Sequence, residues 1–400
     1  MKANEPLNVA VCMTFPAPYR IPLLNRMNKL PGIRVTGLFS TTHFRGRNEA
    51  IAKFEFSYKL FNTNLLLTRN RYGDPVGFVF SPGLWWHLAR SRYDVLVTLG
   101  WTIPDTFMAR AIGKLKRTPT ILWDESIPHA PGAFKQCLQP LLSRYFGSFD
   151  AYLAASDWCR EYMLSMGARA DRVTVFPQVV DNQFFHQEAL RLRAQRETLK
   201  RTFGIATTRT ILYVGQLISR KGVDTLLDAF ELVAARDADV SLVMVGDGVL
   251  RAALQARRAA SAFRERIFIQ SFASQAELPA YYALADLFVL PSQYDTFGVV
   301  VNEAMASGLP VIATSRVGAT GNLVQDYING RVIPPGDAVQ LAEAMLFMLA
   351  DDARRSEMGE LAWARIQQWT IEDAAQAFQK CLALCIASDK QSTPQVMELR

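Results

Sequence analysis

Short runs of apolar residues alternate with longer segments of helical periodicity along the whole chain. The runs are residues 9–13, 35–39, 95–99, 120–123, 151–154 and 173–176 in the first half, and 210–214, 241–245, 267–270, 287–290, 311–313 and 331–333 in the second. Short, uninterrupted apolar runs are typical of strands that are buried on both faces. Their alternation with helical segments predicts an α/β protein in which two parallel sheets carry helices on both faces.

A polar, highly charged segment near residues 183–203 separates the two sets of strands. A chain of 400 residues is also too long for one ordinary domain and suits two. We therefore expect two Rossmann-like, doubly wound domains that face one another across a cleft. Because open parallel sheets bind ligands beyond the carboxyl ends of their strands, that cleft is the expected site.

Residues 291–313, PSQYDTFGVVVNEAMASGLPVIA, place two carboxylates around the start of a predicted helix. Apolar spacing predicts the helix from Val299 to Ser307, so Asp295 precedes its N-terminus and Glu303 lies inside it. Free N–H groups at a helix N-terminus suit a phosphate, and ionised carboxylates accept hydrogen bonds from sugar hydroxyls. The segment therefore predicts a nucleotide-sugar pocket. The alternative is structural, because acidic residues near helix starts also favour the helix dipole.

The same segment resembles the donor-site motif of the family-four retaining glycosyltransferases, which have the GT-B fold. In that motif two glutamates are separated by seven residues, with Phe-Gly between them and E-A-M/L-A-x-G-x-P-V-I beginning at the second. Here Asp295 replaces the first glutamate, and Glu303 and the residues after it match. The resemblance implies that Glu303 binds ribose hydroxyls and that Asp295 helps to orient the sugar. The other donor-site residues that it implies are Phe297, Gly298 and Val299, through their backbone, and Val300.

A second motif, YVGQLISRKG at residues 213–222, follows the first strand of the second half. It resembles the V-G-R-L-x-x-x-K-G motif of the same family. The resemblance implies that Gly215 lets the backbone turn closely and that Lys221 neutralises a diphosphate leaving group. Gln216 stands where the family usually has arginine, and Arg220 is the candidate to replace that cation. The alternative is an ordinary strand–loop–helix connection with solvated basic residues.

Two other places complete the candidate site. Ser271 and Phe272 resemble the start of the loop whose backbone contacts the base in this family. Glu125 follows a buried strand, near the position where many family members have a histidine of the catalytic cleft. The sequence leaves two roles open for Glu125, catalysis or a salt bridge to a nearby arginine. Arg20 likewise either contacts phosphate or acceptor, or braces its own loop.

The resemblance also implies how the chain is divided. Residues 1–185 form an N-terminal acceptor-binding domain, and residues 186–368 form the nucleotide-sugar-binding domain. Residues 369–388 have helical spacing and correspond to the final helix of GT-B enzymes, which crosses back to the N-terminal domain. Residues 389–400 are polar, and we expect them to be a disordered tail.

Charge is distributed unevenly between the two halves of the chain. The net charge is +7, yet residues 1–200 hold 26 Lys and Arg against 15 Asp and Glu, whereas residues 201–400 hold 18 against 22. A basic first half predicts an anionic partner, either a lipid-linked acceptor or anionic lipid headgroups. We expect no nucleic acid partner, because no motif for one is present. Residues 44–71 mix basic and aromatic side chains, which suits either a membrane surface or an amphipathic element that covers the first sheet.

Other features concern location and cofactors. No apolar run reaches 18 residues, so no membrane-spanning helix is predicted. Five cysteines without zinc-binding spacing fit a reducing cytoplasm, and we expect a cytoplasmic protein with peripheral attachment to the inner face of the cell membrane. No metal-ligand cluster is visible, so we expect neither a metal nor another cofactor beyond the donor substrate.

These observations favour a retaining glycosyltransferase that moves a sugar from a nucleotide diphosphate sugar to a hydroxyl of a glycan or lipid-linked glycan, in bacterial polysaccharide or glycolipid biosynthesis. The candidate catalytic residues are Asp295, Lys221 and Glu125. Two alternatives share the ligand. A sugar-nucleotide 2-epimerase would release an epimerised nucleotide sugar without an acceptor. A non-catalytic nucleotide-sugar-binding protein would not turn the ligand over, and the departures at Gln216 and Asp295 keep that class open.

Overall fold

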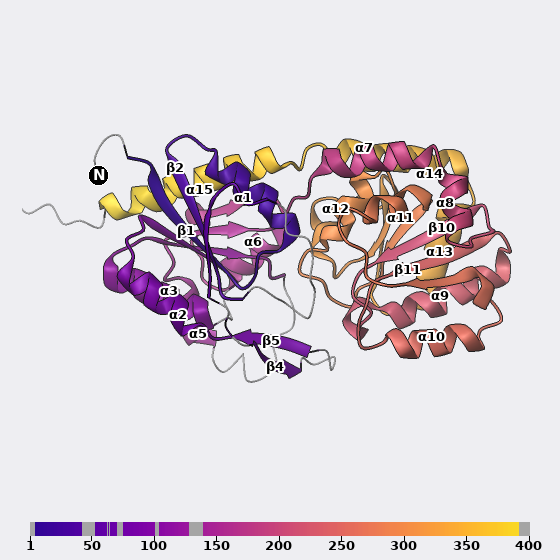
Figure 1. Ribbon diagram of the computed structural model, residues 1–400, viewed down its shortest axis with the longest axis horizontal. Helices are drawn as coiled ribbons and strands as arrows, with labels where there is room; N and C mark the ends of the chain where they lie inside the picture. Colours follow the sequence, from indigo (N-terminus) through magenta and orange to yellow (C-terminus); the bar gives the residue numbers. More distant parts are fainter. Residues whose placement is uncertain are drawn as a thin grey trace, which may run out of the picture. The chain divides into compact units, whose positions relative to one another are not determined.

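The structure, a computed structural model, describes residues 5–41, 53–61, 63, 65–69, 75–100, 104–127 and 139–391. They form two compact units (Figure 1). The first unit consists mainly of the chain up to Gln178 together with the C-terminal helix from Ile371, and the second consists mainly of Val179–Thr370. Each unit has its own parallel sheet and its own buried apolar side chains.

The first unit is built on a seven-stranded parallel sheet. Its strands are β1 (Leu7–Met13), β2 (Ile33–Phe39), β3 (Ser57–Leu60), β6 (Val95–Leu99), β7 (Thr120–Asp124), β8 (Ala151–Ala154) and β9 (Val173–Val175), in the spatial order β3-β2-β1-β6-β7-β8-β9. Apart from the exposed edge strand β3, most of their residues are buried, as their aliphatic and β-branched sequences favour. Strands β4 (Leu65–Arg69) and β5 (Pro75–Val79) pair with one another in a separate two-stranded sheet.

Helices cover both faces of this seven-stranded sheet. They are α1 (Ile21–Asn28), α2 (Pro82–Arg90), α3 (Pro104–Lys116), α5 (Gln139–Phe146), α6 (Asp157–Ser165) and α15 (Ile371–Gln391), with 3-10 turns η1 (Pro18–Arg20) and η2 (Ala170–Arg172). Helices α1 and α15 contact one another, and the guanidinium of Arg26 donates two hydrogen bonds to the carboxylate of Glu372, at 2.6 and 2.8 Å. Helix α15 is therefore part of the first unit.

The second unit contains a six-stranded parallel sheet. Its strands are β10 (Arg209–Val214), β11 (Val240–Val245), β12 (Ile267–Gln270), β13 (Leu287–Leu290), β14 (Val311–Thr314) and β15 (Gly330–Ile333), in the order β12-β11-β10-β13-β14-β15. Its helices are α7 (Asn182–Arg193), α8 (Arg196–Thr202), α9 (Val223–Arg236), α10 (Arg251–Ala260), α11 (Leu278–Leu284), α12 (Val299–Ala306), α13 (Ala338–Leu349) and α14 (Asp352–Ile366), with turns η3 (Ser219–Lys221), η4 (Arg264–Arg266) and η5 (Gly318–Gly321). Helices α7, α13 and α14 each begin at an aspartate whose side chain accepts a backbone N–H of the first turn, which fixes where these helices start.

Both sheets reverse their direction of growth at one point. In the first unit the chain moves outward from β1 to β2 and β3 and then returns to β6 on the other side of β1. In the second unit the same reversal occurs between β10 and β13. Parallel sheets bind ligands beyond the carboxyl ends of the strands at such a reversal. The loops after β10 and β13 are therefore the first place to examine for a site.

All twelve strands predicted from the sequence are present, and their ends differ from the prediction by at most two residues. Strand β3 is not predicted, because its four residues are all exposed and form no apolar run. The units divide between Gln178 and Val179, seven residues before the expected boundary at 185. Helix α15 continues to Gln391, so residues 389–391 are helical rather than part of a disordered tail. Residues 392–400 lie outside the described part of the chain.

The basic and aromatic segment 44–71 is only partly described, because residues 44–52, 62, 64, 70 and 71 lie outside the described ranges. Of the rest, Phe56 is buried, and Tyr58 is exposed on the edge strand with its ring stacked on that of Phe54 at 4.3 Å. No described helix has the length and apolar content to cross a membrane.

We expect Phe378→Ala, in α15, to destabilise the first unit. The Phe378 side chain is fully buried, and its ring centroid lies 6.5 Å from that of Phe176 at the end of β9. Truncating a buried phenylalanine typically costs about 3–5 kcal/mol, because apolar contacts are lost and a cavity remains. Urea unfolding of the full chain measures the change, with Lys380→Ala on the exposed side of the same helix as the control. Equal stability of both variants would show that α15 contributes little to this unit.

Candidate functional site

The loop after β10 carries Lys221. It runs from Gly215 through η3 to Gly222, whose backbone is left-handed, with φ of 67°. A Cβ atom on Gly222 would lie 2.1 Å from the carbonyl oxygen of Pro291, so only glycine fits there. This close approach holds Lys221 against the loop that follows β13.

Asp295 lies in the loop between β13 and α12. Its N–H donates to the carbonyl oxygen of Arg316 at 2.9 Å, and its own carbonyl oxygen accepts from the N–H of Gly318 at 3.1 Å. These two bonds tie the backbone of Asp295 to the loop after β14. The carboxylate is therefore fixed at the carboxyl edge of the sheet.

Lys221 and Asp295 form an ion pair between Nζ and Oδ2. The two side chains are only 12% and 9% exposed. Removing one partner of such a pair leaves a poorly solvated charge, so each group holds the other in place. An ammonium has three N–H donors, which lets Lys221 bind more than one acceptor.

The N-terminus of α12 lies beside this ion pair. Gly298, which caps the helix, has φ of 91°, and a Cβ atom placed on it would lie 3.7 Å from Oδ2 of Asp295. The first N–H groups of a helix have no acceptor within it and carry partial positive charge. Val299 and Val300 supply those groups and are half-buried, whereas the side chain of Phe297 is fully buried. A cation, a carboxylate and a helix N-terminus therefore meet where the sheet reverses.

Arg220 and Gln216 shape the same loop. Nη1 of Arg220 donates to the carbonyl oxygen of Tyr294 at 2.8 Å, which joins the loops after β10 and β13 a second time. The hydroxyl of Tyr213 donates to the carbonyl oxygen of Gln216 at 2.7 Å. Burial, followed by the charge of Asp295, raises the pKa of Tyr213 well above its usual value, so the hydroxyl stays a donor. Arg220 thus has a bracing contact in addition to the positive charge expected of it.

Glu303 lies inside α12 and is almost buried. The hydroxyl of Tyr282, in α11, donates to its Oε2 at 2.7 Å. Burial, with a further contribution from Glu303, raises the pKa of Tyr282 well above its usual value. The tyrosine therefore orients the carboxylate of Glu303.

Ser271 and Phe272 follow β12 at the same edge of the sheet, and both are exposed. Arg251 fixes this loop, because its Nη1 donates to the carbonyl oxygens of Gly246 and Gln270, each at 2.9 Å. The backbone of this loop and the exposed ring of Phe272 therefore lie beyond the carboxyl ends of β11 and β12, and the base-contacting role stays a prediction.

Glu125 belongs to the first unit, where it follows β7. It forms an ion pair with Arg20. The Arg20 side chain is nearly buried and lies over the rings of Tyr19 and Trp123, with its Cζ atom 5.0 and 5.5 Å from the ring centroids. The sequence leaves catalysis or a salt bridge open for Glu125, and the structure shows the salt bridge, with Arg20 as its partner. For Arg20 the structure shows contacts that brace its loop, the ion pair with Glu125 and the packing over the ring of Tyr19.

All the predicted site residues except Glu125 belong to the second unit. Direct contacts join Lys221 and the loop of Arg220 to Asp295 and its loop, beside the start of α12, whereas Glu303 contacts Tyr282 and Ser271 and Phe272 lie on the loop after β12. Sequence reasoning misses Tyr282 and Tyr213, which orient Glu303 and the loop after β10. A signal for Tyr282 exists in retrospect, because a tyrosine in a short, buried helix needs a partner for its hydroxyl. Across the described ranges, no three His, Cys, Asp or Glu side chains are grouped so that they could hold a metal ion.

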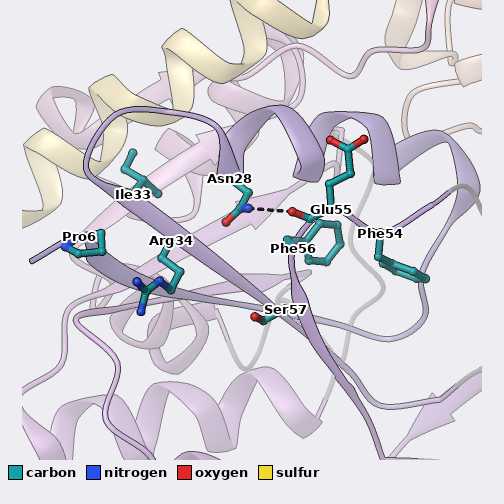
Figure 2. A pocket seen from close by; sticks show the side chains of 8 residues that line it. All are labelled: Pro6, Asn28, Ile33, Arg34, Phe54, Glu55, Phe56 and Ser57. Carbon is teal, nitrogen blue, oxygen red and sulfur yellow. Dashed lines mark hydrogen bonds between the residues drawn. The ribbon is translucent and has the colours of Figure 1, made fainter.

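A separate cavity of about 500 Å³ opens on the first unit (Figure 2). Its lining residues are Pro6, Asn28, Ile33, Arg34, Phe54, Glu55, Phe56 and Ser57. Several of these lie at the amino ends of β1, β2 and β3, and the amide of Asn28 donates to the carbonyl oxygen of Glu55 at 2.9 Å. Because ligands of parallel sheets bind at the opposite, carboxyl edge, this cavity is not the candidate site.

Comparisons with known proteins follow the same division of the chain. Residues 195–364 match the family model described as "Glycosyl transferases group 1", and residues 63–178 match the "Glycosyl transferase 4-like domain". Two curated relatives are an alpha-D-kanosaminyltransferase of Streptomyces kanamyceticus, 31% identical over 48% of this chain and 49% of the relative, and a GDP-mannose-dependent alpha-(1-6)-phosphatidylinositol monomannoside mannosyltransferase of Mycobacterium tuberculosis, 28% identical over 55% and 57%. The chain spans about half the length of the curated relatives that it matches.

Solved structures resemble the chain over nearly its whole length. Anabaena HepE in complex with UDP has a TM-score of 0.72 and 18% identity, with 94% of this chain and 99% of that chain covered. Sucrose-phosphate synthase of Thermosynechococcus elongatus has a TM-score of 0.69 and 20% identity, with 96% and 100% covered. At these identities the likeness shows a shared fold.

We expect Asp124→Asn to remove a pH-dependent loss of stability of the first unit. Burial raises the pKa of Asp124 from 3.8 to about 6. Between these values the unfolded chain loses its proton while the folded chain keeps it, so stability falls as pH rises, by about 3 kcal/mol for two pKa units. Asparagine does not ionise. The free energy of unfolding of the variant should therefore rise relative to that of the wild type from about pH 4 to pH 6, and the difference should persist above pH 6.

Urea unfolding from pH 4 to pH 8 measures this difference. The control is Asp171→Asn, because the hydrogen bond from Arg169 lowers the pKa of the exposed Asp171. Because this pKa lies below 3.8, Asp171 is ionised in both the folded and the unfolded chain over nearly all of this range, so the stability difference for Asp171→Asn should change little between pH 4 and pH 8. A stability difference for Asp124→Asn that does not change with pH would contradict the assignment.

Proposed function

Because the chain belongs to the glycosyl transferases group 1 family and has the GT-B fold, we propose that it transfers a sugar, with retention of anomeric configuration, from a nucleotide diphosphate sugar to a hydroxyl of a glycan or lipid-linked glycan. The observation that carries the proposal is the ion pair of Lys221 and Asp295 beside the N-terminus of α12. A diphosphate sugar needs cations and N–H donors for its phosphates and acceptors for its hydroxyls, and this site contains all three.

The names of the relatives support the donor class. The mycobacterial relative is named as GDP-mannose-dependent, and the Anabaena structure was determined with UDP. Both ligands contain a nucleoside diphosphate. We extend that ligand class to this chain because a diphosphate needs cations and N–H donors, which Lys221, Arg220 and the start of α12 supply at the reversal of the second sheet.

Lys221 and the first turn of α12 would act on the leaving group. As the bond from the anomeric carbon to the diphosphate oxygen breaks, negative charge grows on that oxygen, and fixed donors stabilise it more than they stabilise the intact donor. Arg220 adds positive potential, whereas Gln216 contributes no charge. Lys221 keeps its contact with Asp295 while it donates to the phosphate, because it has more than one N–H.

The oxygen of the acceptor hydroxyl would form the new glycosidic bond. Its oxygen bonds to the anomeric carbon on the side that the diphosphate leaves, and its proton passes to the departing diphosphate oxygen. The products are the glycoside and the nucleoside diphosphate, and the configuration is retained. Asp295 orients the sugar hydroxyls, and Glu303, held by Tyr282, accepts hydrogen bonds from the ribose. Glu125, held by Arg20, is assigned to the acceptor side as a hydrogen-bond acceptor.

A thermal-shift screen followed by a turnover assay tests the function. A nucleoside diphosphate that binds the folded chain raises its apparent stability by mass action, so UDP, GDP and ADP and their sugars identify the donor. The best donor is then incubated with glycan and lipid-linked acceptors. A glycoside of retained configuration supports the proposal. Epimerised nucleotide sugar formed without an acceptor would indicate a 2-epimerase, and binding without turnover would indicate a non-catalytic protein.

Glu303→Gln should weaken nucleoside diphosphate binding without unfolding the chain. Glutamine keeps the size of the side chain but loses the charge, and a hydrogen bond to a charged group contributes about 1.5–3 kcal/mol. The dissociation constant from titration calorimetry should rise roughly 10- to 100-fold. Glu343→Gln, an exposed glutamate of α13 in the same unit, is the control. Unchanged affinity in Glu303→Gln would rule out the ribose role.

Lys221→Ala should reduce kcat far more than it raises the KM for the donor. The charge that it neutralises grows in the transition state, and loss of one such donor typically lowers kcat by about 10²- to 10³-fold. Because Lys221→Ala also leaves Asp295 without its cation, Lys221→Ala/Asp295→Asn and an unfolding measurement separate a folding defect from a catalytic one. An unchanged kcat with a raised KM would mean that Lys221 only binds the donor.

A further inference from the structure

Helices α2, α3, α5 and α6 cover one face of the first sheet as a single layer. Strand register aligns Cys12 with Thr98, Thr98 with Leu122, and Leu122 with Tyr152, so these four side chains share one face. Cys12 packs with α2 and α3, and Tyr152 packs with α5 and α6. Helix α15 packs on the other face (Figure 1). The layer therefore has one outer surface that faces away from the sheet.

The outer surface of α2, α3 and α5 exposes large apolar side chains. They are Phe80, just before α2, Trp86, Phe107, Leu115 and Leu141. Leu115 is 85% exposed, Leu141 65% and Trp86 61%. Four of the five exposed positions of α3, 107, 111, 114 and 115, have the spacing of one helical face, and the fifth is Lys116 at the end of the helix, so most of the exposure follows a stripe. We name this surface, with its basic residues given below, the α2–α3–α5 surface.

Contacts between the three helices make the α2–α3–α5 surface continuous. The ring of Phe107 in α3 stacks on that of Tyr145 in α5, with centroids 4.3 Å apart. Nζ of Lys116, at the end of α3, donates to the carbonyl oxygen of Leu88 in α2 at 3.0 Å. The exposed apolar side chains of the three helices therefore belong to neighbouring elements and not to separate parts of the unit.

The charge of this surface has one sign. Helices α2 and α5 contain no acidic residue. The one acid of α3, Asp105, is buried and accepts hydrogen bonds from the N–H of Ser81 and from Nε1 of Trp85. The exposed basic residues of the three helices are Arg90, Lys114, Lys116 and Arg144, and Arg117 follows directly after α3. The guanidinium of Arg90 lies 4.0 Å from the centroid of the Trp86 ring, so the two side chains form a cation–π contact on this surface.

We propose that the α2–α3–α5 surface docks the first unit on an anionic lipid bilayer. Exposed tryptophan, phenylalanine and leucine side chains enter the headgroup region, while arginine and lysine remain at the anionic surface, which is the composition of interfacial helices. Each basic group near such a surface adds attraction, and several together give reversible binding. A second copy of the chain is a poorer occupant, because a symmetric contact would place two basic surfaces against one another.

The position of this surface fits the proposed function, on which this step rests. Phe107 lies in the first turn of α3, which begins after the carboxyl end of β6. One end of the surface therefore lies at the edge of the first sheet where parallel sheets bind ligands. An acceptor anchored in the bilayer would meet the protein at that edge, so the acceptor class is a lipid-linked glycan rather than a free one.

Co-sedimentation of the full chain with vesicles tests the docking without any substrate. Phosphatidylglycerol/phosphatidylcholine vesicles are compared with pure phosphatidylcholine vesicles at 0.1 and 1 M salt, where the Debye length falls from ~10 to ~3 Å. We expect binding to the anionic vesicles only, and loss of most of it at high salt. Equal binding to both vesicle types, or none to either, would overturn the proposal.

Two variants locate the contact. Leu115→Ser/Leu141→Ser should lower the partition coefficient roughly tenfold or more, whereas Leu190→Ser/Val249→Ser, at exposed apolar positions of the second unit, should not change it. Lys114→Glu should lower it roughly 5- to 30-fold, and Lys380→Glu on α15, on the other face of the sheet, should not. Wild-type vesicle binding by Leu115→Ser/Leu141→Ser or by Lys114→Glu would overturn the assignment of this surface.

Two further readouts separate the remaining explanations. Sedimentation velocity reports self-association, and a dimer in the wild type that Leu115→Ser/Leu141→Ser abolishes would assign the surface to a second copy instead and overturn the proposal. Nucleoside diphosphate binding without vesicles reads the proposed function independently. Loss of vesicle binding with intact nucleotide binding places a failure in the docking alone, whereas absent nucleotide binding by the wild type places it in the proposed function.

Discussion

Direct packing of backbone on backbone is the constraint on which the candidate site depends. A Cβ atom on Gly222 would lie 2.1 Å from the carbonyl oxygen of Pro291, and one on Gly318 would lie 2.1 Å from that of Thr296. The loops after β10, β13 and β14 therefore touch through their main chains. Because the backbone fixes where these loops lie, the ammonium and the carboxylate that they carry meet in one arrangement, and the start of α12 is set beside them.

This arrangement divides electrostatic work among its parts. Lys221 and Asp295 together carry no net charge, so they do not attract a diphosphate from a distance. Attraction comes instead from Arg220 and from the partial charge at the start of α12. In the proposed function the ion pair would contribute at short range, where one N–H of the ammonium could donate to a phosphate oxygen. In the proposed function, Arg220 would therefore serve mainly to recruit the anion and Lys221 to stabilise its developing charge, while the start of α12 would serve both.

The sequence predicts the sheets well, because strands buried on both faces need uninterrupted apolar runs, as in β11, which is entirely buried. It points to the segment 291–313 as a candidate site because a helix start, a glycine and two carboxylates that lie close together in the sequence are the groups that bind a phosphate and sugar hydroxyls. It does not predict β3, whose pairing satisfies backbone groups and buries no side chain. Nor does it predict that Tyr282 meets Glu303 or that Arg20 meets Glu125, because such partners are 21 and 105 residues apart and only the folded chain brings them together.

Helix α15 has a consequence for the order in which the molecule is made. During synthesis residues 5–178 emerge from the ribosome before the second unit does, yet the first unit lacks the helix that packs on β8 and β9 until residues 371–391 have emerged. The second unit is almost continuous in sequence, so it can fold as soon as residue 370 has left the exit tunnel. The part of the chain that is translated first is thus completed last. A stop codon or proteolytic cut near residue 371 would damage the amino-terminal half of the protein more than the half that it adjoins.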